Sequence, residues 1–251
     1  MRKTRLLIAF TALPLAFPLG AETPPFDRPG TGFSPVTLPA RTFAWEQGLP
    51  DMVRQKSGGV TQILYSADAL MRAGLSDKLE LQLSHAPYNY LRTGGRGPAR
   101  EVEGASGTGI SLKVALPAPN ETLSWALLGG STLDTGDAPF SPEDTIYSLG
   151  SSLQWQLRND RSLSLYVNVD RIGGESAITI SPSYSLAINA CSGAYLELAV
   201  TRFERRDRAL AGGGLTWMVV DNVQLDLYAN FGLNSAANDL QAGFGFSVFI
   251  E

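Results

Sequence analysis

The sequence predicts an all-β protein, an antiparallel transmembrane β-barrel of about 12 strands with short periplasmic turns and longer external loops. Three observations carry this prediction. Apolar and polar residues alternate with a period of two, the signature of strands. Tight connections alternate with longer ones, as in outer-membrane barrels. Charged residues are only 18% of the chain, against about 25% in typical soluble domains.

The N-terminus has the layout of a secretory signal peptide over residues 1–21. Met1–Arg5 is positively charged, residues 6–17 are mostly apolar, and Ala21 is a small residue suited to cleavage. We therefore expect export and an outer-membrane location in a Gram-negative cell.

Residues 22–41 form a proline-rich segment, with prolines at positions 24, 25, 29, 35 and 39. Proline fixes φ and removes a backbone donor, so the segment is neither a helix nor a central strand. We expect a tail, or a plug that folds into the periplasmic mouth around Asp27 and Arg28.

Residues 42–251 are expected to form the barrel, because alternating runs recur to the end of the chain. Pro182 falls inside one run and predicts a local bulge. The connections expected to be tight are Ser76–Lys78, Pro117–Glu121, Arg158–Arg161, Ile188–Ala190 and Asp221–Asn222. Those expected to be longer are Leu49–Gly59, Tyr88–Ser106, Leu133–Asp144, Arg171–Glu175, Arg205–Arg208 and Gly232–Asp239.

The tryptophans fall near one rim of the predicted barrel. Indole rings favour the headgroup boundary of a bilayer, so these residues predict an aromatic belt. The belt consists of Trp45, Trp125, Trp155 and Trp217.

Strand parity turns a set of polar residues toward the barrel lumen, where they avoid the cost of facing lipid. Such a face fits a polar, weakly acidic conduit, and it equally fits a packed, salt-bridged interior that conducts nothing. The lumen-lining candidates are Glu46, Asp68, Arg72, Glu80, Gln82, Lys113, Gln154, Glu197 and Asp226.

Several short motifs resemble one outer-membrane family, the transporters associated with the meta pathway of phenol degradation. The motifs are Asp27-Arg28-Pro29, Trp45–Leu49, Met71–Leu81, Leu127–Ser131, Asn230–Asn234 and Gly243–Phe246. The resemblance implies an outer-membrane barrel that passes small organic solutes.

Composition argues against several other classes of function. The net charge of −4 argues against nucleic acid as a partner, and one cysteine and one histidine leave no disulfide and no multi-histidine metal site. We expect no metal and no cofactor. Ser84 and His85, with Asn89 nearby, suggest a barrel lipid hydrolase, but adjacent strand residues point to opposite faces. The chain is therefore predicted not to be an enzyme.

The function that these patterns favour is passive passage of small organic solutes, with aromatic ones as candidates. The alternatives are a closed structural or ligand-binding barrel and, less favoured, the lipid hydrolase. The expected partners are the outer-membrane bilayer, the outer-membrane assembly machinery and small hydrophobic or neutral solutes.

Overall fold

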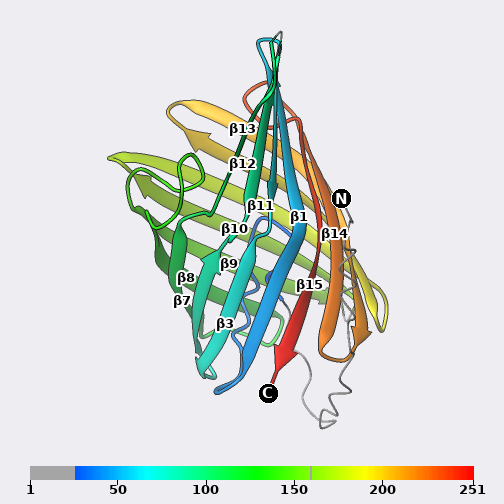
Figure 1. Cartoon of the computed structure of the whole chain (residues 1–251). Coiled ribbons are helices and arrows are strands. Elements are labelled where there is room, and N and C mark those ends of the chain that lie inside the picture. The colour runs from blue at the N-terminus through cyan, green and yellow to red at the C-terminus, as the bar shows by residue number, and fades with distance from the viewer. Residues whose placement is uncertain (1–25, 96, 159) are drawn as a thin grey trace, which may run out of the picture.

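The computed structural model describes residues 26–95, 97–158 and 160–251, and the signal peptide expected over residues 1–21 lies outside them. One antiparallel sheet curls until β15 pairs with β1, which closes a barrel of 12 strands (Figure 1). The predicted fold class is confirmed. Three strands are interrupted, so the sheet has 15 segments. They are β1 (Phe43–Ser57), β2 (Val60–Ser66), β3 (Ala69–Ser76), β4 (Leu79–His85), β5 (Asn89–Gly94), β6 (Arg100–Gly104), β7 (Thr108–Leu116), β8 (Leu123–Leu133), β9 (Ile146–Arg158), β10 (Arg161–Ile172), β11 (Glu175–Asn189), β12 (Ser192–Phe203), β13 (Arg206–Val220), β14 (Val223–Gly232) and β15 (Leu240–Ile250).

Closure runs along nearly the whole length of the first and last strands. β1 and β15 pair from Phe43 opposite Ile250 to Arg54 opposite Leu240, with a register shift between Gly48 and Asp51. Lipid offers no hydrogen-bond partners to a strand edge, so a sheet that spans a bilayer must close in this way.

A narrow finger extends beyond one end of the barrel and consists of the outer half of β1 with β2, β5 and β6 (Figure 1). We call this the loop end, and the opposite end the tight-turn end. The prediction of long loops over residues 49–59 and 88–106 is therefore wrong, because most of these residues lie in paired strands. Gly58 and Gly59, at φ 57° and 80°, close the β1–β2 hairpin in two residues, which lets both strands continue to the turn.

Two more connections at the loop end are shorter than predicted. Gly173 and Gly174 have φ 52° and 95°, and Glu204 and Arg205 have φ 47° and 63°, which closes each hairpin in two residues. The bulge predicted at Pro182 is also wrong. Ile180 pairs with Val200 and Ser183 with Glu197, in the same register on both sides of the proline.

The described part of the N-terminal segment, residues 26–41, lies against the inside of the wall. Phe26 and Leu38 pack with Ala44 of β1 and Phe249 of β15. The Thr37 hydroxyl donates a hydrogen bond of 2.9 Å to the carbonyl of Asp77, in the tight turn between β3 and β4. The segment therefore enters from the tight-turn end.

No helix among the described residues is long and apolar enough to cross a membrane.

Candidate functional site in the barrel interior

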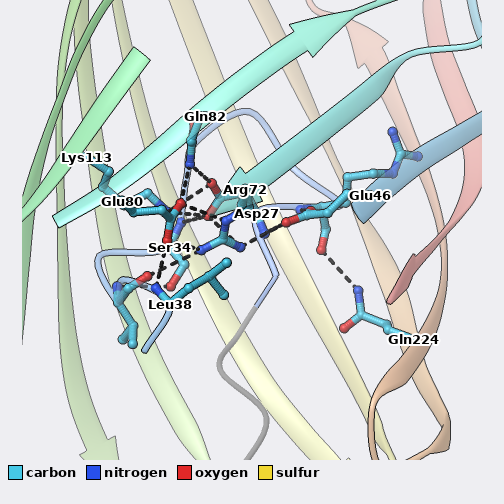
Figure 2. A network of polar contacts seen from close by, with 11 residues as sticks. Asp27, Ser34, Leu38, Glu46, Arg72, Glu80, Gln82, Lys113 and Gln224 are labelled. Carbon is cyan, nitrogen blue, oxygen red and sulfur yellow. Dashed lines mark hydrogen bonds and ion pairs between the residues drawn. The ribbon is translucent and has the colours of Figure 1, made fainter. Parts of the chain in front are cut away.

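Arg72 is the centre of a buried ion network inside the wall (Figure 2). Its Nη1 lies 2.9 Å from Glu46 Oε1 and 3.6 Å from Asp27 Oδ1, and its Nε lies 2.8 Å from Glu80 Oε1. Lys113 Nζ lies 2.9 Å from Asp27 Oδ1 and 3.3 Å from Glu80 Oε1. Four of these five side chains are 0% exposed and Asp27 is 7% exposed. Burial of charge is costly, and mutual pairing offsets that cost.

Strand order brings the wall members of this network together. β7, β4, β3 and β1 are consecutive neighbours in the sheet. Lys113 of β7 is directly opposite Glu80 of β4, and Arg72 of β3 is opposite Gln82 of β4. Because alternate strand residues point to one face, residues far apart in sequence meet on the lumen side.

The wall also binds the backbone of the N-terminal segment. Glu46 accepts hydrogen bonds from the backbone N–H groups of Asp27 (3.0 Å) and Arg28 (2.6 Å). Leu38 N–H donates to Glu80 Oε2 at 2.8 Å, and Thr31 N–H donates to Glu197 Oε2 at 2.9 Å. A coil without regular structure has free N–H groups, which need partners when buried. Wall carboxylates supply them.

Asp27 is the acidic group that this segment contributes to the network. Burial works to raise the pKa of its carboxyl, but the charges of Arg72 and Lys113 hold that pKa below its ordinary value. Lys113 also lies 5.4 Å from the ring centre of Phe33 in the same segment, a favourable cation–π geometry.

The structure places the predicted lumen residues unequally. Seven are buried on the inner wall, whereas Gln154 is half-buried beside a cavity and Asp68 is exposed in the break between β2 and β3. Asp51 also lies on the inner wall, and it was not among the predicted residues because it falls in a predicted loop. The seven buried residues are Glu46, Arg72, Glu80, Gln82, Lys113, Glu197 and Asp226.

The described residues enclose an inner and an outer cavity within the barrel. The inner cavity, toward the tight-turn end, has about 370 Å³ and is bounded by residues 26–35 and by serine-rich stretches of β9, β10 and β11. The outer cavity, toward the loop end, has about 600 Å³ and is bounded by Glu46, Asp68, His85 and residues 139–142 of the β8–β9 loop. The serines at alternate positions 181, 183 and 185 line the inner cavity and were not among the predicted lumen residues, although their period of two was a usable signal.

Comparison with protein families shows which family this chain belongs to. The family described as "Putative MetA-pathway of phenol degradation" matches residues 26–249. The chain belongs to this family. The resemblance noted in the sequence is confirmed, and the match includes the N-terminal segment as well as the barrel. No curated protein matches the chain.

Solved structures place this member of the phenol-degradation family among outer-membrane barrels. The COG4313 outer membrane channel from Pseudomonas putida F1 is 10% identical, with a TM-score of 0.66 over 86% of this chain and 97% of that chain. The KdgM porin is 8% identical, with a TM-score of 0.55 over 84% and 98%. The translocator domain of the autotransporter NalP from Neisseria meningitidis is 9% identical, with a TM-score of 0.52 over 90% of each chain. At such identities the likeness shows the fold, and this fold serves several tasks.

The four predicted belt tryptophans all stand on the outer wall of this family member. Their exposed fractions are 45% for Trp45, 37% for Trp125, 39% for Trp155 and 54% for Trp217. Trp45 packs edge to face with Phe246 of the neighbouring strand, 5.5 Å between ring centres. Large apolar side chains on an outer surface fit contact with lipid.

The hydrolase candidates do not assemble into a triad. Asn89 donates to the carbonyls of Ala86 and Gly104 and receives a hydrogen bond from Ser66. The buried Nδ1 of His85 has no hydrogen-bond partner among the described residues. A base in such a site needs a third group to orient it, and Asn89 is engaged elsewhere.

Proposed function

We propose that this protein is an outer-membrane channel for passive passage of small organic solutes, narrowed at rest by its N-terminal segment. The observation that carries the proposal is the pair of cavities at the two ends of the barrel interior, the inner one with a serine-rich wall and the outer one with a mixed polar and apolar wall. A water molecule takes about 30 Å³ of liquid, so each cavity has room for a solute of several heavy atoms.

Charge and family support the choice of solute. The wall carries more carboxylates than cations, which favours neutral or cationic solutes over anions. The family description names phenol degradation, so we include small aromatic compounds in the proposed class. On this proposal the protein is not an enzyme. Its partners are the bilayer and, during insertion, the assembly machinery of the outer membrane.

A closed barrel is the second candidate, and the buried ion network favours it. Arg72, Lys113 and their carboxylates occupy one side of the lumen and tie the N-terminal segment to the wall. Such a network specifies a fixed arrangement. In this alternative the cavities bind ligands or remain unused.

Liposome swelling distinguishes the two candidates. We expect proteoliposomes to swell in small neutral polar solutes, with a steep fall as solute size increases. Deletion of residues 22–40 should remove much of that size limit, because it clears the inside of the wall. Swelling by the deletion variant alone would favour the closed barrel. Swelling by neither protein would refute the channel.

A further inference from the structure

Arg28 is the residue shared by the linings of the two cavities within the described part of the chain. Its backbone continues the N-terminal segment along the inner cavity. Its side chain reaches the wall between the inner and the outer cavity. Arg28 therefore lies at the boundary between the two cavities.

The wall holds Arg28 from two strands. Its Nη1 lies 2.7 Å from Asp51 Oδ2, and its Nη2 lies 3.2 Å from Asp51 Oδ1 and 3.2 Å from Asp226 Oδ1. Gln224 donates to the Arg28 carbonyl at 3.1 Å. The two-pronged contact with Asp51 is the strong, directional kind of carboxylate pair.

Three glycines make room for this pair, and we call them the glycine notch: Gly48 of β1 with Gly243 and Gly245 of β15. Gly48 is opposite Gly245, and Gly243 is opposite Asp51. A Cβ on Gly245 would lie 2.7 Å from both Nε and Nη2 of Arg28. A Cβ on Gly48 would overlap the Asp51 carboxylate and lie 3.1 Å from Arg28 Nη1. Glycine weakens a strand, so its presence here matches the need to seat the guanidinium.

The hydrogen-bonding groups of Arg28 and its carboxylate partners are not all satisfied in the glycine notch. The Nε of Arg28 and the Oδ2 of Asp226 are buried without hydrogen-bond partners among the described residues. Each unsatisfied group raises the free energy of the closed arrangement. Arg28 is also 15% exposed at its side chain, whereas Arg72 is 0% exposed. Movement of the Arg28 side chain out of the notch therefore costs less free energy than disruption of the Arg72 network.

We propose that Arg28 is the gate residue of the channel, and this inference rests on the proposed function. Seated in the glycine notch, its guanidinium separates the two cavities. When the Arg28 side chain leaves the notch, the two cavities become connected. Asp51 and Asp226 then face the passage without the cation that they share. The open channel therefore favours cations more strongly than the closed one.

The test is single-channel recording of the full-length mature protein and its variants, with the reversal potential measured across a KCl gradient. Arg28→Ala should give a severalfold larger conductance and a reversal potential shifted toward that of the cation. Arg28→Lys keeps the charge but loses the two-pronged contact, so both values should be intermediate. Arg41→Ala is the matched control, because Arg41 is exposed at the end of the same segment, and it should behave like the wild type.

Gly48→Ala provides a second test that keeps every charge. Its added methyl meets side-chain atoms of Asp51 and Arg28, so it should unseat the pair and raise conductance with a smaller change in selectivity. Heat-modifiable migration on a gel confirms that each variant folds. A conducting wild type with unchanged Arg28→Ala and Gly48→Ala variants would overturn the gate and leave the channel standing. No conductance from the wild type, the variants or the 22–40 deletion would overturn the proposed function itself.

Discussion

Replacement of Arg72 by methionine should destabilise the barrel more than any other single loss of charge in the network. Arg72 contacts Glu46, Glu80 and Asp27, and these side chains are 0%, 0% and 7% exposed. Its removal leaves three buried carboxylates with Lys113 alone. Breaking a buried pair typically costs about 3–5 kcal/mol, because the abandoned charge stays buried. We expect a loss of that order in the free energy of unfolding.

The assay is equilibrium urea unfolding of the protein in lipid vesicles, followed by tryptophan fluorescence. Arg92→Ala is the control, since the Arg92–Glu101 pair spans 3.8 Å between side chains that are more than half exposed, and exposed pairs contribute little. The double variant Arg72→Met with Glu80→Gln should recover part of the loss, because it removes one of the stranded charges. An Arg72→Met protein that unfolds at the wild-type urea concentration would refute the reasoning.

Three further predictions concern the outer wall and the orientation of the barrel. Leu227 is 53% exposed near the middle of β14, and Leu227→Arg should cost about 2–4 kcal/mol of folding free energy in vesicles. Leu227→Ala should cost less, and equal losses would argue against lipid contact at this position. The four tryptophans should be quenched more by lipids brominated near the headgroups than by lipids brominated at the chain ends, and the reverse order would remove the belt. Cys191, exposed at the turn between β11 and β12, should react with a large impermeant maleimide only after the outer membrane is permeabilised, and labelling of intact cells would reverse the assigned orientation.

The strands from β7 to β15 could be predicted from sequence because each has lipid on one face and polar lumen on the other. That contrast imposes a strict period of two, visible in β15 as phenylalanines alternating with glycines. The finger could not be predicted in this way. It extends beyond the end of the barrel (Figure 1), so we expect water on both of its faces, and Pro50 and the register shift near Gly48 interrupt the alternation in β1. Asp51 was assigned to a loop for that reason.

The inside of the barrel was predictable in composition but not in arrangement. Parity turned Arg72, Glu80 and Lys113 inward, and strand pairing then brought them together. Nothing in the prolines of residues 22–41 specifies where an irregular segment docks. The available cue was an excess of inward carboxylates over inward cations, which called for donors from elsewhere. Arg28 and the backbone N–H groups of residues 27–38 are those donors.

Single-channel conductance of the refolded mature protein, compared with that of the variant lacking residues 22–40, is the decisive measurement for a channel narrowed by its N-terminal segment. We expect small discrete steps from the intact protein, favouring cations, and larger steps from the deletion variant. A bilayer that stays silent with both proteins inserted would rule out the channel.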